Sequence, residues 1–279
     1  MSFHAEKGRN YMIDIHSHIL PGVDDGSPDL EMSLRMLKMA ADNGTKSIIA
    51  TPHVIESRNV LTWDNIKKIS EDLQAEAEKV CIDIKIFPGA EVELNYEMLE
   101  YIRSGKNMYG LAESRYILIE MPMLQYPVNL EDMIYELQLM GRFPILAHPE
   151  RQRELMKKPE VLLNMLRKGV LTQSNGNSIT GSFGTEIKHN VDLLLRNKMV
   201  TFVASDAHNC KNRKTSLSHA KEVLTDMLGE TEMSYLTGLN QEYIITDEEF
   251  PEKRFLSNLP DSVKEKEVKK KSLFGFFRF

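Results

Sequence analysis

Short runs of apolar, often β-branched residues alternate along the chain with longer stretches in which apolar residues recur at helical spacing. Seven runs are predicted as strands, at residues 11–16, 46–53, 82–93, 115–122, 142–150, 170–175 and 200–208. Amphipathic stretches lie between them. One is residues 29–44, ended by Gly44, and another is residues 129–142, with Asn129 as the predicted N-cap and Gly141 at the end. Repeated strand and helix units of this length predict an α/β fold with a parallel sheet or a closed barrel.

The strand and helix pattern extends from residue 12 to residue 250 without a linker, which predicts one domain. Residues 1–11 are predicted to be an N-terminal extension, because Met12 itself can open the first strand. The pattern is lost from Pro251 onward, and residues 251–279 are predicted to be a flexible tail rich in basic and aromatic residues.

Polar residues stand at the ends of the predicted strands. Each strand except the sixth ends in His, Glu or Asp, and the residues concerned are His16, His18, His53, Glu91, Glu120, His148, Asp206 and His208. In a parallel barrel the carboxyl ends of the strands meet at one mouth, so these side chains are expected to converge. A single histidine at a strand end is more often structural, but the repetition predicts a shared metal site.

The donor atoms of this set are imidazole nitrogens and carboxylate oxygens without a thiolate, which favours manganese, zinc or iron over a structural zinc cage. Eight ligands suit three divalent ions. Their six positive charges exceed the three negative charges of Glu91, Glu120 and Asp206, so the site is expected to bind an anion such as a phosphate monoester. Glu93 shares a strand face with Glu91, so spacing does not decide which of the two is the ligand.

Composition excludes some functions. The formal net charge of −6 and a pI near 5.8 argue against general nucleic-acid binding, which usually leaves a basic footprint. The two cysteines, Cys81 and Cys210, show no zinc or redox spacing and are expected to be reduced. The N-terminus is polar and no run of eighteen apolar residues occurs, so a cytoplasmic protein is predicted.

The motifs DIHSH, TPH, GAEVE, HPER and SDAH occur in this order, and through them the chain resembles the polymerase-and-histidinol-phosphatase (PHP) superfamily. The segments MIDIHSHILPGVDDG, IIATPH and ILAHPER are most similar to its bacterial capsule-biosynthesis protein-tyrosine phosphatases. The resemblance covers roughly residues 12–250. It implies a distorted TIM-like (β/α)7 barrel of the PHP type and a centre of three divalent ions, usually manganese, with iron or zinc as alternatives.

The resemblance also implies how the ligands are shared. It assigns His16, His18, Glu91 and Asp206 to one ion, Glu91, Glu120 and His148 to a second, and His53 and His208 to a third.

Three further residues are expected to support catalysis. Asp14 is expected to orient a histidine by accepting its ring N–H. Arg151 and Arg213 follow ligand histidines and are expected to bind phosphate, with a solvated surface arginine as the alternative for each. Asp24 and Asp25 either hold a loop or act near the leaving group, and turn chemistry explains them equally well.

The implied reaction is hydrolysis of phosphotyrosine by attack of a metal-bridging hydroxide. Neither cysteine can replace the metal, because a cysteine-based phosphatase needs an arginine six positions after the nucleophile, and Phe87 and Ser216 stand there. One alternative is a small-molecule phosphatase of the same superfamily, such as a histidinol-phosphate phosphatase. An amidohydrolase is a second, although Glu120 stands where such enzymes commonly have a lysine. A catalytically silent regulator is a third, but no ligand is missing.

The resemblance implies a protein partner, the phosphotyrosine-bearing tail of a tyrosine autokinase that regulates capsule or exopolysaccharide synthesis. Residues 177–184, NSITGSFG, either shape an open mouth for a phosphopeptide or form an ordinary connector. The terminal KEKEVKKKSLFGFFRF is either solvated or makes peripheral contact with anionic lipid at the inner face of the membrane.

Overall fold

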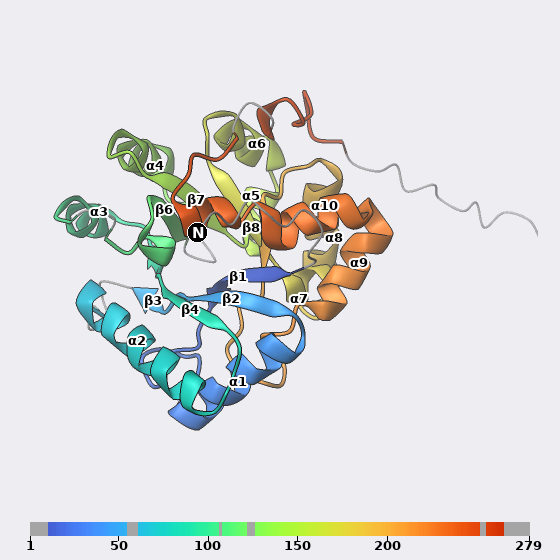
Figure 1. The fold of residues 1–279 in the computed structure, drawn as a ribbon. Coiled ribbons are helices and arrows are strands. Elements are labelled where there is room, and N and C mark those ends of the chain that lie inside the picture. The colour runs from blue at the N-terminus through green and yellow to red at the C-terminus, as the bar shows by residue number, and fades with distance from the viewer. Residues whose placement is uncertain (1–10, 55–60, 106–107, 122–125, 252–254, 265–279) are drawn as a thin grey trace, which may run out of the picture.

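The computed structural model places the strands at the centre of the molecule and the helices around them (Figure 1). It describes residues 11–54, 61–105, 108–121, 126–251 and 255–264. The N-terminal extension, apart from Tyr11, and the lysine- and phenylalanine-rich end at residues 265–279 lie outside the described residues.

The described strands pair in parallel throughout. They are β1 (Met12–Ser17), β2 (Thr45–Ala50), β3 (His53–Val54), β4 (Lys85–Pro88), β5 (Glu91–Glu93), β6 (Tyr116–Glu120), β7 (Phe143–Ala147), β8 (Leu171–Asn175) and β9 (Phe202–Ala204). One sheet has the order β1-β2-β4 and the other β3-β5-β6-β7-β8-β9. Each of the seven predicted strand runs overlaps at least one of these strands, so the predicted parallel α/β fold is confirmed.

The two sheets continue into each other. β3 follows β2 after two residues and β5 follows β4 after two residues, so β2–β3 and β4–β5 are each one interrupted strand that pairs in both sheets. On the other side, Ser17 after β1 forms a parallel bridge with Ala207 after β9. The backbone pairing therefore runs through seven strand positions and joins the last to the first, as in a small barrel.

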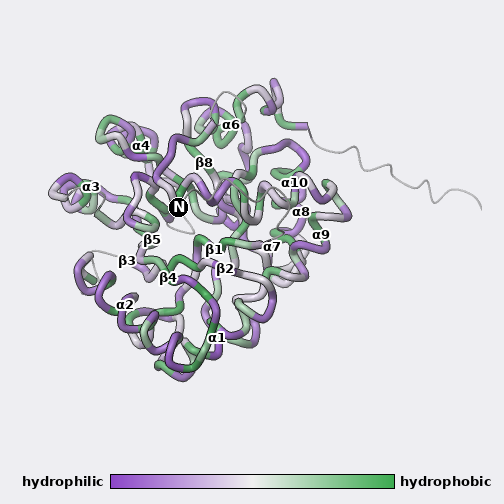
Figure 2. Tube along the Cα trace, viewed as in Figure 1, coloured by the Kyte–Doolittle hydropathy of each residue, from purple (hydrophilic) through white to green (hydrophobic). Residues whose placement is uncertain are grey.

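Two apolar clusters hold this arrangement together. Alternate strand residues such as Ile117 and Ile119 belong to the same cluster as residues of the surrounding helices, for example Met36 and Leu37. The residues between them, such as Leu118, form a second cluster with Ile244. Because successive strand side chains point to opposite faces, one set faces the helices and the other faces the inside of the ring. Figure 2 accordingly shows hydrophobic residues along the central strands and mixed hydropathy along the outer helices.

The helices lie outside the strands (Figure 1). They are α1 (Leu30–Asp42), α2 (Trp63–Lys79), α3 (Tyr96–Arg103), α4 (Leu130–Leu139), α5 (Arg153–Met156), α6 (Pro159–Arg167), α7 (Gly176–Ile179), α8 (Thr185–Arg196), α9 (Ser218–Leu228), α10 (Glu230–Ser234) and α11 (Glu242–Thr246), with the short turns η2 (Leu111–Glu113), η3 (Pro149–Arg151) and η4 (Tyr235–Leu239).

Both helices predicted in detail are present. Gly44 follows α1 with a φ of 92°, and Gly141 follows α4 with a φ of 74°. These left-handed conformations favour glycine and end the helices where the sequence predicts. Asn129 is the N-cap of α4, although its side chain makes no capping hydrogen bond.

Part of the predicted tail packs against the domain. The Val263 N–H donates to Glu160 Oε1 at 2.8 Å, and Arg167 Nη2 donates to the carbonyl of Pro260 at 3.0 Å. Phe255 contacts both apolar clusters. Across the described chain, no helix has the length and apolar composition needed to cross a bilayer.

Candidate metal centre

Glu91 is the centre of the predicted ligand set. Its Oε2 lies 3.2 Å from His16 Nε2, 3.3 Å from His18 Nε2 and 3.1 Å from His53 Nδ1. Its Oε1 lies 2.9 Å from His148 Nε2. The side chain of Glu91 is 1% exposed, so a carboxylate in contact with four imidazole rings is enclosed by the protein. The structure therefore brings together residues that are far apart in the sequence.

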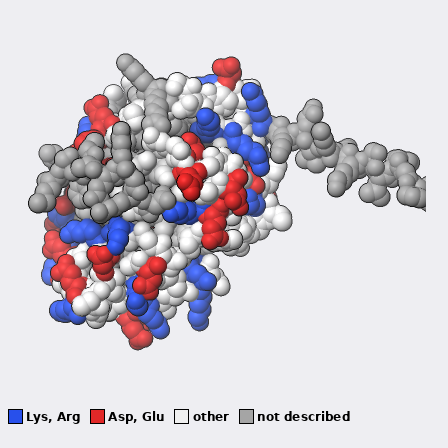
Figure 3. Space-filling model, turned by 45° about the vertical axis from the view of Figure 1, so that its right-hand side comes forward, with Lys and Arg blue, Asp and Glu red and all other residues white. Residues whose placement is uncertain are grey.

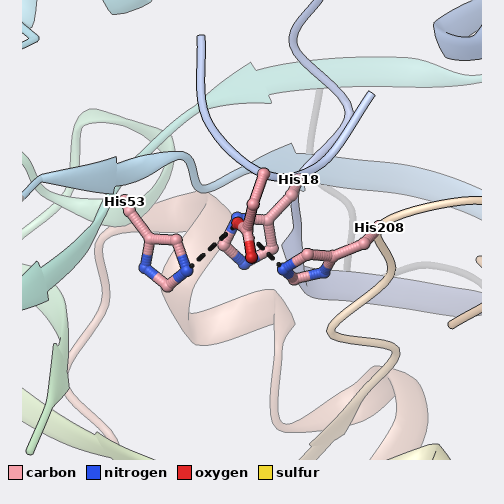
Figure 4. A group of neighbouring side chains, drawn as sticks. His18, His53 and His208 are labelled. Carbon is pink, nitrogen blue, oxygen red and sulfur yellow. Dashed lines mark ion pairs between the residues drawn. The ribbon is translucent and has the colours of Figure 1, made fainter. Parts of the chain in front are cut away.

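A second part of the cluster forms around three histidines, His18, His53 and His208 (Figure 4). The ring centres of His18 and His208 are 3.9 Å apart, and those of His18 and His53 are 4.6 Å apart. Asp25 Oδ1 lies 3.3 Å from His208 Nε2 and 3.5 Å from His53 Nε2. Asp25 is thus part of the cluster. The sequence alone had not decided whether it holds a loop or takes part in the reaction.

Glu120 and Asp206 complete the acidic side of the cluster. Glu120 Oε2 lies 3.5 Å from His53 Nδ1, and its Oε1 lies 3.7 Å from His148 Nε2. Asp206 Oδ1 lies 3.5 Å from both His16 Nε2 and His18 Nε2. All eight residues predicted as metal ligands from the strand ends consequently lie within one connected group.

The chemistry of this group fits divalent cations. Buried atoms that have no hydrogen-bond partner within the described chain include Glu91 Oε2, His53 Nδ1 and His208 Nε2. Such atoms cost free energy when buried alone, whereas a cation coordinated by them removes that cost. Three sets have ligand atoms close enough to share an ion: His16, His18 and Glu91; His53, Glu91 and Glu120; and His18, Asp25, His53 and His208. His18, His53 and Glu91 belong to two sets each, so the assignment of every ligand to a particular ion stays a prediction.

The backbone at the cluster is constrained at two ligand positions. His148 directly follows β7 with a φ of 34°, and Asp206 lies two residues after β9 with a φ of 50°. Residues other than glycine rarely adopt this region, and such strained positions are concentrated at functional sites. With this left-handed backbone conformation, both side chains lie in the cluster directly after the strands end.

Asp24 holds the loop after β1 against the histidines. Its Oδ2 lies 2.7 Å from His18 Nδ1 and accepts the backbone N–H of His53 at 3.1 Å. Its Oδ1 accepts the Gly26 N–H at 2.9 Å. A Cβ at Gly26 would lie 2.2 Å from the carbonyl oxygen of His18, so this close return of the loop requires glycine. Asp24 is therefore the residue that orients His18.

Strand β8, which corresponds to the sixth predicted strand, supplies hydrogen-bond partners of the candidate ligands that the sequence did not reveal. Gln173 Oε1 lies 2.8 Å from His16 Nδ1. Gln173 Nε2 donates to Asn175 Oδ1 at 2.9 Å, and Asn175 Nδ2 donates to Asp206 Oδ2 at 2.6 Å. This chain of hydrogen bonds links His16 to Asp206, two predicted ligands, and fixes their orientation. The available signal was that Gln173 and Asn175 stand at the end of a strand, but neither is a usual metal ligand.

The predicted role of Asp14 as the acceptor of a histidine ring N–H is wrong. Asp14 Oδ1 accepts the backbone N–H of Ser205 at 3.0 Å and that of His16 at 3.4 Å. The ring N–H groups nearest in sequence have other partners, since His16 Nδ1 lies 2.8 Å from Gln173 Oε1 and His18 Nδ1 lies 2.7 Å from Asp24 Oδ2. Burial raises the pKa of Asp14 to about 6. The Asp14 side chain therefore links the backbone of β1 to the backbone directly after β9.

Both predicted arginines reach the cluster through Asp206. Arg151 Nη1 donates to Asp206 Oδ2 at 2.9 Å, and Arg213 Nη2 donates to Asp206 Oδ1 at 2.6 Å. Arg213 Nε is buried without a partner within the described chain. The side chains of Arg151 and Arg213 are 17% and 25% exposed, so neither is an ordinary surface residue. An anion beside Asp206 would meet two guanidinium groups.

The cluster carries a strong local field. Burial opposes ionisation of Asp206, but His16, His18 and Arg213 outweigh it and hold the pKa of Asp206 well below its usual value. Burial lowers the pKa of His53 and of His208, which favours the neutral imidazole that a metal requires. Burial, together with the charge of Glu91, raises the pKa of Glu120 to about 7.

Metal binding is expected to release protons. A protonated Glu120 cannot coordinate a cation, and its pKa of about 7 means that protonation competes with the metal below that pH. Affinity for Mn²⁺ should therefore rise from about pH 6 to about pH 8. Isothermal titration of metal-stripped protein in buffers of different ionisation enthalpy measures both the affinity and the protons released. An affinity that is flat across this range would contradict the assignment of Glu120 as a ligand.

Loss of the charge on Asp24 is expected to weaken metal binding. Asp24→Asn keeps the size of the side chain but weakens the hold on His18, and removal of such supporting partners costs about 10- to 100-fold in metal affinity. Asp42→Asn is the matched control, because Asp42 is 59% exposed and pairs with Lys38 on α1. If both variants bind Mn²⁺ as tightly as the unmodified protein, Asp24 does not position His18.

The fold and the cluster together define a metal-binding α/β protein with its site at the carboxyl ends of parallel strands. The chain belongs to the capsular polysaccharide synthesis CpsB/CapC family, whose model matches residues 12–246.

Relatives of this chain agree with that membership. It is 34% identical over 270 residues to the tyrosine-protein phosphatase YwqE of Bacillus subtilis, covering 95% of this chain and all of that protein. It is 29% identical over 239 residues to the tyrosine-protein phosphatase CpsB of Streptococcus agalactiae, covering 84% of this chain and 98% of that protein. Among solved structures, a chain from the work on YwqE of B. subtilis and CpsB of Streptococcus pneumoniae, described there as unique metal-dependent tyrosine phosphatases, matches with a TM-score of 0.81. That match has 34% identity and covers 86% of this chain and 96% of the other.

Proposed function

We propose that this chain is a metal-dependent protein-tyrosine phosphatase that hydrolyses phosphotyrosine. The observation that carries the proposal is the convergence of the histidine and carboxylate cluster with two arginines at one end of the strand ring. The relatives named as tyrosine-protein phosphatases support the substrate class.

The residues divide the work between metal binding and phosphate binding. We assign metal binding to His16, His18, His53, Glu91, Glu120, His148, Asp206 and His208, with Asp25 as a ninth candidate. When bound, the ions supply Lewis acidity that activates water and neutralises phosphoryl charge. Arg151 and Arg213 would donate N–H groups to the phosphate oxygens and stabilise the charge that develops there.

The ions themselves belong to the proposal. Nitrogen and oxygen donors without a thiolate suit manganese, iron or zinc, and we propose three ions with manganese as the working metal. Their six positive charges would exceed the four negative charges of Glu91, Glu120, Asp206 and Asp25. The surplus favours a doubly charged phosphate monoester over a neutral substrate.

The cysteines have no part in the proposed reaction. Cys81 is an exposed residue directly after the C-cap of α2, and it lies outside the histidine and carboxylate cluster. Cys210 lies two residues from His208, where burial raises the pKa of its thiol. A nucleophilic cysteine needs a lowered pKa, so this shift is in the wrong direction for nucleophilic catalysis.

We propose that the substrate is the phosphotyrosine-bearing tail of a tyrosine autokinase that regulates capsule or exopolysaccharide synthesis at the cytoplasmic face of the membrane. Membership of a capsular polysaccharide synthesis family supports the process. A nucleic-acid substrate is not expected, since the net charge is −6 and Figure 3 shows acidic and basic side chains interspersed over the described part of that face.

The C-terminal residues 265–279 suggest where the enzyme works, although they lie outside the described residues. Lysines that attract anionic lipid and phenylalanines that enter the interface would place the enzyme beside a membrane-bound kinase. Fractionation of the full chain and of a chain ended at residue 264 tests this. Equal recovery of both in the membrane fraction would remove the membrane contact from the proposal.

A substrate panel tests the proposed activity. Mn²⁺-loaded protein is given a phosphotyrosine peptide, a phosphoserine peptide and histidinol phosphate, and phosphate release is measured. The proposal predicts hydrolysis confined to the phosphotyrosine peptide. Preference for histidinol phosphate would identify a small-molecule phosphatase of the same fold, and failure on all three with metal bound would identify a silent regulator.

A further inference from the structure

Phe183 lies against the guanidinium group of Arg151. The Arg151 Cζ is 5.2 Å from the centre of the Phe183 ring, which is within the range of a cation–π interaction. Phe183 is half-buried, and it belongs to neither of the apolar clusters formed by the described residues. The packing of the core therefore does not account for a large aromatic side chain at this position.

The loop that carries Phe183 is built to present it. Residues 177–184 run from α7 to the start of α8, and two glycines enclose the phenylalanine. Gly181 and Gly184 have φ values of 80° and 96°, which favour glycine. The Gly184 N–H donates to the Gly181 carbonyl at 3.0 Å. This tight turn fixes the place from which the Phe183 side chain starts.

Hydrogen bonds tie the same region to the segments that carry both arginines. Asn190 Nδ2, on α8, donates to the carbonyl of Glu150 in η3 at 3.0 Å. Asn177 Nδ2 donates to the carbonyl of Asn212, the residue before Arg213, at 3.4 Å. The position of Phe183 relative to the arginines is thus set by the fold.

Arg151 is consequently held on two sides. Asp206 accepts a hydrogen bond from Nη1 of the guanidinium, and the guanidinium carbon lies over the Phe183 ring. An arginine side chain has considerable rotamer freedom, and contacts that remove it leave the other N–H groups in one orientation. We propose that Phe183 is a positioning residue that holds Arg151 ready for the phosphate of the substrate. This inference rests on the proposed function, in which Arg151 binds phosphate.

The test is a double-mutant cycle on Mn²⁺-loaded protein with phosphotyrosine peptide and with phenyl phosphate, an aryl phosphate monoester without a peptide. Phe183→Ala is expected to lower kcat/KM roughly three- to tenfold, which corresponds to the loss of one cation–π contact. Phe183→Ala should alter the same kinetic parameter, kcat or KM, that Arg151→Ala alters more strongly. In the Arg151→Ala background, Phe183→Ala should have no further effect.

Conservative variants separate positioning from simple packing. Phe183→Tyr keeps the ring and should retain activity, whereas Phe183→Leu keeps apolar volume without a π face and should behave like Phe183→Ala. Metal content and thermal unfolding of each variant show that the fold is intact. An equal loss with Phe183→Ala in the presence and absence of Arg151 would overturn the inference, as would a loss confined to the peptide substrate, which would mean that Phe183 contacts the peptide rather than Arg151. If Arg151→Ala itself changes nothing, the proposed phosphate-binding role of Arg151 fails first.

Discussion

Glu91→Gln is expected to lower kcat for phosphotyrosine hydrolysis on the order of a thousandfold or more, because the metal contribution is several kcal/mol. Glu91 Oε2 lies within 3.3 Å of nitrogens from His16, His18 and His53, and Glu91 occurs in two of the three sets that could hold an ion. Glutamine is the same size but neutral, so two neighbouring ions would lose the ligand they share. Metal content after dialysis and kcat at saturating Mn²⁺ measure the two consequences.

Glu93→Gln is the matched control for that experiment. Both glutamates belong to β5, but Glu93 pairs with Glu120 in the backbone register and is outside the sets that could hold an ion among the described residues. It should therefore keep metal and activity within about the twofold scatter expected of a surface substitution. If Glu93→Gln is inactive and Glu91→Gln is active, the metal ligand is Glu93 and not Glu91.

Loss of both arginines is the second large effect. Arg151→Ala combined with Arg213→Ala is expected to lower kcat/KM about a hundredfold or more, because removal of a single preorganised donor at a developing charge already costs that much. Both guanidinium groups contact Asp206, so the double variant also frees that carboxylate. Metal content should change far less than in the Glu91→Gln protein. The comparison of kcat/KM with bound metal distinguishes phosphate binding from metal binding.

Arg153→Ala provides the control for this loss. Arg153 lies two residues from Arg151 but is 66% exposed, and its charged partner is Glu186 on α8. It should retain full activity, since an exposed pair of this kind contributes little. If the double variant also retains activity, the arginines serve only to neutralise Asp206.

The strands and the convergence of the candidate ligands were predictable for the same physical reason. Apolar runs that end in His, Glu or Asp mark both a buried parallel strand and the end at which such strands meet. Glu120 and His148 are examples, each found at or directly after the strand that its sequence predicts. Convergence follows from topology, and topology was readable from the alternation of strands and helices.

The supporting residues were not predictable in this way. Gln173 on β8 contacts His16 on β1 although β9 lies between the two strands, and no local spacing reveals this contact. Asp25 stands in a turn where aspartate is common for local reasons, so its approach to His208 appears only in three dimensions. Asp14 accepts the backbone N–H of Ser205, and this contact between β1 and the segment after β9 is not readable from local spacing.

Restoration of activity by metal is the most direct test of whether the histidine and carboxylate cluster is a catalytic metal centre. Protein stripped with a chelator is assayed on a phosphotyrosine peptide before and after addition of Mn²⁺, beside a His16→Ala, His18→Ala variant treated identically. We expect no hydrolysis by the stripped protein, recovery of hydrolysis with Mn²⁺, and no recovery in the variant. Full activity in the stripped protein, or equal recovery in the variant, would contradict the conclusion that this histidine and carboxylate cluster is the catalytic metal centre.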